Sequence, residues 1–136
     1  MPFRPSRRSI LQLAASCGVT LSFPLRAARS QTSFNIFFDF QSTLMSGAAT
    51  ELADRLAQEI MPAGRVMLVG HADTAEAQPE RLSYARGNEV LKHFLRKQAL
   101  VRVRFDVVSG GVSTPLIRTG PNIQEPRNRR VEVILG

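Results

Sequence analysis

The chain has 136 residues, with 18 Lys and Arg residues, 11 Asp and Glu residues, one Cys and no Trp. This length accommodates one domain of ordinary size but not two, and a single Cys excludes an internal disulfide framework or a Cys-rich zinc site. The hydrophobic fraction of 43% is that of a globular protein. The formal net charge of +7 would suit a nucleic-acid or anionic-membrane partner, so its position along the chain has to be considered.

The positive charge is concentrated at the N-terminus. Residues 1–30 hold five Arg residues and no acidic residue, which leaves 13 basic and 11 acidic residues over 31–136, a net charge of +2. Most of the basic character therefore lies outside the segment that has a globular composition, and we predict no nucleic-acid partner.

The first 30 residues have the three-part order of an export signal. A basic segment, Arg4–Arg8, precedes an apolar segment, Ile10–Phe23, and small residues follow before Gln31. The run SRRSILQ resembles the twin-arginine export motif. We predict an export signal peptide over 1–30 and a mature domain over 31–136 in the periplasm. The apolar segment is shorter and more polar than the ~20 residues that a membrane-spanning helix needs, so we predict no membrane span in the mature protein.

Two alternatives stay open for this segment. It could remain attached as an amphipathic arm or a membrane anchor. Alternatively, Cys17 in the run AASCG lies in a loose match to a lipoprotein box and would then carry a lipid. If Cys17 leaves with the signal, the mature protein has no cysteine.

The first half of the mature chain predicts two strands and a helix. Apolar residues alternate over Phe34–Phe40, which is typical of a strand with one apolar face. Helical spacing of apolar residues over Ser46–Ile60 predicts an amphipathic helix, which Pro62–Gly64 ends. The short apolar run Arg65–Gly70 predicts a buried strand.

The second half predicts a helix and two further strands. A polar loop over His71–Pro79 precedes a helix over Leu82–Gln98, and alternation over Val101–Val107 predicts a third strand. A long loop rich in Gly and Pro covers residues 110–129. The run Arg130–Leu135 predicts the last strand.

The order of these elements predicts the fold class. The order is βαβαββ, and two helices are enough to cover only one face of a sheet. We therefore predict an α/β (α+β) two-layer sandwich, in which a mixed four-stranded sheet carries both helices on one face.

Four segments, FNIFFDFQSTL, VMLVGHAD, RLSYARGNEVLKHFL and NRRVEVIL, follow one another over about residues 34–135. Together they resemble the OmpA-like C-terminal domain, a periplasmic module that binds peptidoglycan, and the terminal NRRVEV is the most specific of them. The resemblance implies an OmpA-like fold and a binding module that is not an enzyme. It also implies non-covalent attachment to diaminopimelate in the peptide stem of peptidoglycan, with no cofactor.

The resemblance also implies which residues hold the ligand. The free end of diaminopimelate carries an ammonium and a carboxylate. Asp73 matches the aspartate of the family and would accept hydrogen bonds from the ammonium. Arg86, in the LSxxR run, matches the arginine that would donate two parallel hydrogen bonds to the carboxylate. Phe40 and Gln41 match residues that line the same pocket, and Arg129 matches a residue at its rim.

Without the resemblance, the same residues have simpler interpretations. Asp73 fits an acceptor of backbone hydrogen bonds in its own loop. Arg86 falls outside the apolar stripe near the start of its helix, as expected for a solvated side chain. His71 and Asp73 are too few ligands for a metal, and no catalytic set is visible. We therefore predict no metal site and no enzymatic activity; a small hydrolase built on these two residues would need a metal.

The loop 74–81 departs from the family pattern. Glu76 stands where relatives carry Gly, and Pro79 stands where they carry Asn. Pro79 has neither a backbone N–H nor an amide side chain, and Glu76 adds a negative charge that should oppose a ligand carboxylate unless it turns away. An alternative function follows: a degenerate OmpA-like module that binds an envelope protein.

Overall fold

The computed structural model describes residues 31–61 and 63–136. The predicted export signal over 1–30, including its paired arginines and Cys17, lies outside the described residues.

The described elements follow the predicted order. In chain order they are strand β1 (Thr32–Phe37), helix α2 (Gly47–Ile60), strand β2 (Arg65–His71), helix α3 (Pro79–Leu95), 3-10 turn η1 (Gln98–Leu100), strand β3 (Arg104–Gly111), 3-10 turn η2 (Pro126–Asn128) and strand β4 (Arg130–Leu135). These elements form a mixed four-stranded sheet with two helices. The predicted two-layer α/β sandwich is confirmed.

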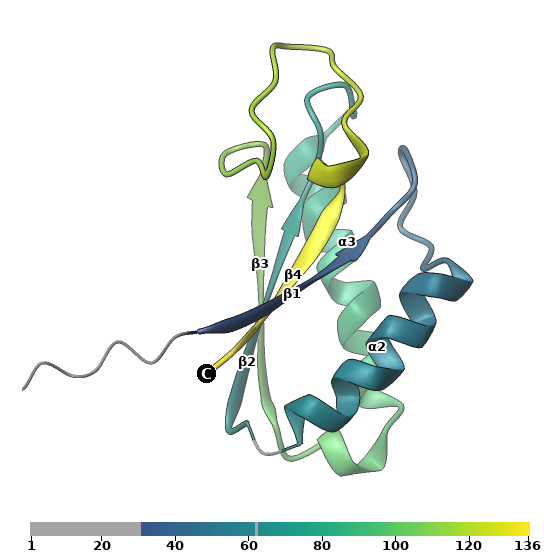
Figure 1. The fold of residues 1–136 in the computed structure, drawn as a ribbon, viewed down its shortest axis with the longest axis vertical. Helices are drawn as coiled ribbons and strands as arrows, with labels where there is room; N and C mark the ends of the chain where they lie inside the picture. The colour runs from purple at the N-terminus through teal and green to yellow at the C-terminus, as the bar shows by residue number, and fades with distance from the viewer. Residues whose placement is uncertain (1–30, 62) are drawn as a thin grey trace, which may run out of the picture. The chain divides into compact units, whose positions relative to one another are not determined.

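The strand order in the sheet is β1-β4-β2-β3. Strands β2 and β3 are parallel and are connected through α3, whereas β4 is antiparallel to both β1 and β2. The ends of β1, β2 and β3 and the start of β4 therefore lie at the same end of the sheet. Figure 1 shows the loop between β2 and α3 beside the long loop between β3 and β4 at this end.

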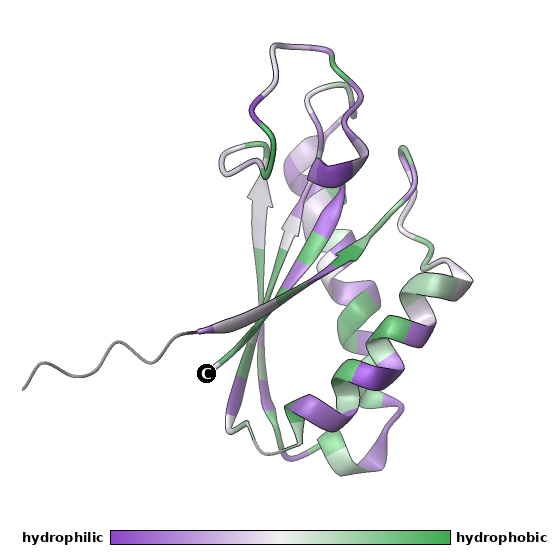
Figure 2. Cartoon of the chain, viewed as in Figure 1, coloured by the Kyte–Doolittle hydropathy of each residue, from purple (hydrophilic) through white to green (hydrophobic). Residues whose placement is uncertain are grey.

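Both helices pack their apolar residues on one face of the sheet. Helix α2 begins after Ser46, whose side-chain oxygen accepts a hydrogen bond from Ala49 N (3.1 Å). The buried core joins the helices to β1, β2 and β4 through Ala53, Leu56, Ile60, Val90, Phe94, Ile36, Val66, Leu68, Val131 and Val133. Figure 2 shows hydrophobic and hydrophilic residues alternating along α2, whereas the long loop after β3 has short hydrophobic stretches between hydrophilic and near-neutral ones.

The boundaries of α3 differ from the prediction. The helix begins at Pro79, three residues early, after Gln78 in a left-handed conformation (φ 49°). Proline favours the first helical position because its missing N–H would have no partner there. The helix ends at Leu95, and the η1 turn then buries Leu100 (1% exposed) in the core. Strand β3 consequently begins at Arg104 and not at Val101.

Helix α3 lies unusually close to the sheet at two glycines. A Cβ atom on Gly70 would lie 1.8 Å from the carbonyl oxygen of Ser83, and one on Gly87 would lie 2.7 Å from Cγ1 of Val107. Glycine in a helix costs up to about 1 kcal/mol relative to alanine. At Gly87 that cost accompanies a close approach that a side chain would obstruct.

We expect Gly70→Ala to lower the free energy of unfolding by about 3 kcal/mol, because the contact on α3 is backbone that cannot move aside without shifting the helix. Gly47→Ala is the matched control, since no atom lies within 4 Å of the Cβ position there, and its effect should stay below about 1 kcal/mol. Urea unfolding of the two variants measures both values. Equal losses in the two variants would contradict the close contact between α3 and β2.

Candidate functional site

Arg86 is a buried residue in the middle of α3. Its exposed fraction is 0%, so the prediction of an outward-facing side chain is wrong. The prediction that it lies near the start of its helix is also wrong, because the helix begins at Pro79, about two turns earlier. Arg86 therefore lies beyond the first turn, over which the positive end of the helix dipole acts.

Every N–H group of the Arg86 guanidinium has an acceptor. Nε donates to the backbone oxygen of Ser42 (2.9 Å), Nη1 to that of His71 (3.1 Å) and Nη2 to that of Asp39 (3.0 Å). Nη1 also donates to Oε1 of Glu76 (2.8 Å), and Nη2 donates to Oε2 of the same carboxylate. Because a guanidinium has five N–H donors, no donor is left for a ligand in this arrangement.

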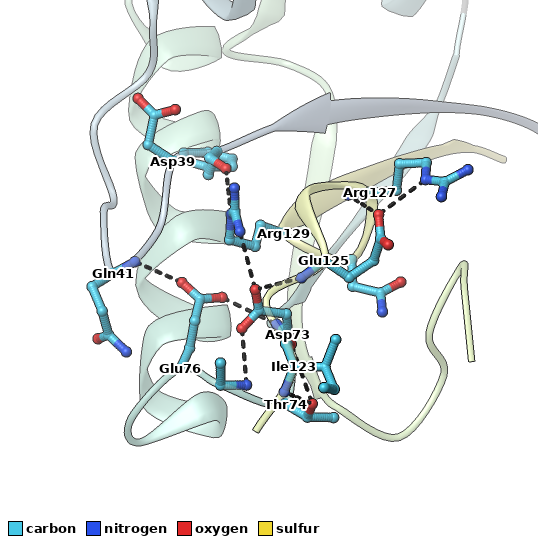
Figure 3. A network of polar contacts seen from close by, with 12 residues as sticks. Asp39, Gln41, Asp73, Thr74, Glu76, Ile123, Glu125, Arg127 and Arg129 are labelled. Atoms are coloured by element: carbon cyan, nitrogen blue, oxygen red, sulfur yellow. Dashed lines mark hydrogen bonds and ion pairs between the residues drawn. The ribbon is translucent and has the colours of Figure 1, made fainter. Parts of the chain in front are cut away.

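Glu76 is the buried partner of Arg86. Its side chain is 0% exposed. The carboxylate also accepts hydrogen bonds from the backbone nitrogens of Asp73 (3.1 Å) and Gln41 (2.8 Å), as Figure 3 shows. Glu76 thus does not turn away from the predicted ligand site. It forms an ion pair with the guanidinium that was expected to bind the ligand carboxylate.

Asp73 connects its own loop to the long loop before β4. Its side chain is buried, and Oδ1 accepts a hydrogen bond from Ala75 N (3.1 Å). Oδ2 accepts hydrogen bonds from Glu125 N (3.0 Å) and from Nη1 of Arg129 (3.1 Å). Asp73 therefore accepts backbone hydrogen bonds, as the residue by itself suggested, and forms an ion pair with Arg129 as well (Figure 3).

Side chains also order the long loop between β3 and β4. Oγ1 of Thr74 donates to the backbone oxygen of Gly120 (2.7 Å) and accepts from Ile123 N (3.0 Å). The side-chain amide of Asn128 binds both the backbone N–H (2.9 Å) and the carbonyl (2.7 Å) of Ile117. Such hydrogen bonds from side chain to backbone hold irregular segments in one conformation.

Arg129 lies between this cluster and an open pocket. Its Nε donates to the backbone oxygen of Phe38 (3.1 Å), and its guanidinium carbon lies 6.0 Å from the centre of the Phe40 ring. Nη2 has no hydrogen-bond partner among the described residues. The pocket has a volume of about 300 Å³ and is lined by Phe37, Phe38, Asp39, Ser46, Pro126, Arg127 and Arg129.

The structure brings all five predicted site residues to one end of the sheet. Asp73 contacts Arg129, which lies over Phe40. Gln41 and Arg86 join the cluster through Glu76. Gln41 contributes its backbone N–H and not its side chain.

The sequence did not identify the parts played by Glu76 and Asp39. Asp39 lines the pocket with an exposed side chain and also supplies a backbone acceptor to Arg86. Its position beside Phe40 at the end of the first strand was the available signal. Across the pocket, Arg127 is paired with Glu125 (2.9 Å), and this hydrogen bond lowers the pKa of the Glu125 carboxyl. The pocket thus presents one acidic and two basic side chains.

A second buried polar group lies on the face of the sheet away from the helices. The His71 side chain is 3% exposed, and Nε2 lies 3.7 Å from the Glu132 carboxylate. Neither ring nitrogen has a hydrogen-bond partner among the described residues. Burial, and secondly the charge of Arg130, lower the pKa of His71 to about 4. Within residues 31–61 and 63–136, no group of three His, Cys, Asp or Glu residues is placed to hold a metal.

No family model matches the chain. A curated relative, described as an outer membrane protein of Gluconacetobacter diazotrophicus, is 32% identical over 110 residues. The match covers 74% of this chain and 29% of the relative, so the chain spans less than a third of that protein's length.

Solved structures with similar folds come from several bacteria. The peptidoglycan-associated lipoprotein from Burkholderia pseudomallei matches 75% of this chain and 89% of its own, with a TM-score of 0.62 and 20% identity. The cell wall anchor of the T6SS from Pseudomonas aeruginosa matches 77% and 80%, with a TM-score of 0.64 and 23% identity. An OmpA-like domain from Francisella tularensis subsp. tularensis matches 77% and 71%, with a TM-score of 0.58 and 14% identity.

The chain has the OmpA-like fold. The fold expected from the four sequence segments is therefore confirmed, and the cluster around Asp73 joins the loops at one end of this OmpA-like sheet to helix α3. None of the helices in the described part of the chain is long and apolar enough to cross a membrane.

The buried His71 predicts a loss of stability in acid. Its pKa is about 4 in the folded protein, against an ordinary value of 6.5, so the unfolded chain binds a proton first as the pH falls. The stabilisation is complete above about pH 6.5 and is lost between there and pH 4, by roughly 3 kcal/mol. Urea unfolding at several pH values measures this loss. His71→Gln should show a flatter profile over the same range, whereas parallel profiles would contradict the assignment.

Proposed function

We propose that this chain is an exported cell-envelope module that binds peptidoglycan non-covalently. The observation that carries this proposal is its OmpA-like fold, which it shares with a peptidoglycan-associated lipoprotein and with a cell wall anchor. The sequence match to an outer membrane protein supports the same location. In this role the chain is a binding protein and not an enzyme, it needs no cofactor, and it acts in the periplasm after residues 1–30 have directed its export.

We further propose diaminopimelate of the peptide stem as the group that is recognised. The free end of diaminopimelate carries an ammonium and a carboxylate, and the cluster offers an acidic group in the loop after β2 and a basic group on helix α3. Asp73 is the proposed acceptor for the ammonium and Arg86 the proposed donor to the carboxylate. Both are buried, so the ligand would exchange with contacts that already exist.

The open pocket is the proposed entrance to this cluster. Arg129 is the first proposed contact, because it lines the pocket and also holds Asp73 (3.1 Å). Phe40, which is 40% exposed and lies 6.0 Å from the guanidinium carbon of Arg129, and Gln41 are the further proposed contacts. A guanidinium that has donors to spare and rests on an aromatic ring is suited to bind a carboxylate.

A second candidate function is favoured by one observation. Because Glu76 and three backbone carbonyls use every donor of Arg86, the site can instead be a closed structural feature. The OmpA-like module would then bind an envelope protein. The exposed apolar residues Leu116 and Ile123 of the long loop would be available for such a contact.

Sedimentation with purified peptidoglycan separates the two functions. We expect the exported protein in the pellet. Arg129→Ala should reduce the bound fraction about tenfold, because a charge-assisted hydrogen bond to the ligand is lost. Asp73→Ala and Arg86→Ala should reduce it as well, with circular dichroism to confirm that each variant is folded. Free diaminopimelate should release the wild type.

Arg55→Ala is the matched control for charge, since that side chain is 78% exposed on α2 and should leave binding unchanged. A wild-type protein that stays in the supernatant would exclude peptidoglycan binding and favour the second function. Equal binding by all variants would leave the function intact but refute the proposed site.

The export proposal has its own measurement. Mass spectrometry of the protein from the envelope fraction should find Gln31 as the first residue, because the small residues before it suit signal cleavage. A mass that includes a lipid on Cys17, or an intact N-terminus, would contradict cleavage at this position.

A further inference from the structure

Four N–H groups converge on a single carboxylate in the cluster. Two belong to Nη1 and Nη2 of Arg86, and two are the backbone N–H groups of Asp73 and Gln41. We call these four donors the carboxylate nest. The carboxylate in the nest is that of Glu76, which reaches it from the same short loop as Asp73. Each of its two oxygens accepts one guanidinium and one backbone hydrogen bond.

The position of Arg86 in the nest does not depend on Glu76 alone. Its three other N–H groups donate to the backbone oxygens of residues 39, 42 and 71, and its guanidinium carbon lies 5.5 Å from the centre of the Phe38 ring. Acceptors from the loop after β1 and from the last residue of β2 therefore orient the guanidinium, with Nη1 and Nη2 each keeping one N–H for the carboxylate. Two parallel charge-assisted bonds are the arrangement by which arginine binds carboxylates in general. Nothing in these four donors requires the carboxylate to belong to this chain.

We propose that Glu76 is an intramolecular occupant of a carboxylate-binding site, where its side chain competes with the carboxylate of the ligand for Arg86. This inference rests on the proposed function for the identity of the ligand as diaminopimelate. The apparent affinity of such a site is its intrinsic affinity reduced by the fraction of molecules in which the site is free. Glu76 therefore determines how strongly the module holds its ligand.

Glu76 also controls access to the nest. Its carboxylate connects Gln41, in the loop after β1, to Asp73, in the loop after β2. Loss of the side chain removes both of these bonds together with the atoms that fill the nest. A small carboxylate needs the least opening of the loops, so acetate is the first probe, and diaminopimelate tests the ligand itself.

The first experiment is rescue of Glu76→Ala by acetate in the full chain. The variant should melt below the wild type, because the buried charge of Arg86 has lost its partner. Sodium acetate at tens of millimolar should then raise its melting temperature by about 4 °C relative to sodium chloride of equal ionic strength. The wild type should not respond, and neither should Glu59→Ala, a matched removal of an exposed glutamate from α2.

The second experiment is calorimetric titration with diaminopimelate. We expect Glu76→Ala to bind at least tenfold more tightly than the wild type, which corresponds to a nest that is free in less than about one molecule in ten of the wild type. Glu76→Gln is the second variant and carries the test if the alanine variant does not fold. Its amide has the same size, but its NH₂ group faces N–H donors, so the amide should leave the nest and give an intermediate affinity. In Glu76→Ala/Arg86→Met, both the acetate response and the gain in affinity should be absent.

The outcomes separate this inference from the proposed function. If the wild type binds peptidoglycan but Glu76→Ala neither responds to acetate nor gains affinity for diaminopimelate, Glu76 is only a structural residue and the inference is overturned. If acetate stabilises Glu76→Ala but the wild type stays in the supernatant with peptidoglycan, the proposed function is overturned. The nest then stands as a site for an exchangeable carboxylate.

Discussion

The arrangement of the loops at the end of the sheet where the site lies depends on the buried ion pair between Glu76 and Arg86. The pair joins three segments that are separate in the sequence: the loop after β1, the loop after β2 and helix α3. Burial of two charges is costly unless their remaining hydrogen-bonding groups are also satisfied. Here all five donors of Arg86 and both oxygens of Glu76 have partners. The pair therefore fixes the relative positions of the three segments, and neither charge can be removed without leaving the other uncompensated.

Asp73 holds the long loop between β3 and β4 through hydrogen bonds, as Glu76 holds the loop after β1. It binds Arg129 and the backbone of Glu125, while Thr74 beside it binds the same loop at two further points. Two carboxylates in one short segment thus order both sides of the site. This arrangement changes the energetics of recognition, because a ligand would have to replace existing bonds. The open part of the site is limited to the pocket beside Arg129.

Individual residues show where sequence patterns were sufficient to predict the fold and where they were not. Alternation over β1 and helical spacing in α2 predicted which faces are buried, because burial of one face is the physical origin of those periods. Phe40 and Val101, which were assigned to strands, lie outside them and are exposed. The start of α3 was missed although Pro79 is the residue that favours a first helical position. The later start of β3 was not predictable, since it follows from the burial of Leu100 in a 3-10 turn. Arg86 was assigned to the outer side of its helix because charged residues are usually solvated.

The βαβαββ order, the two-layer sandwich and the uneven distribution of charge can all be derived from the amino-acid sequence. Through its resemblance to a known module, it also indicated the five residues that gather at one end of the sheet. The ion pair between Glu76 and Arg86 and the one between Asp73 and Arg129 become visible only in the folded protein. The reason is physical. Periodicity reports the side of an element on which a residue lies, whereas the partner of a buried charge depends on backbone carbonyl and N–H groups that the sheet brings together from distant parts of the chain.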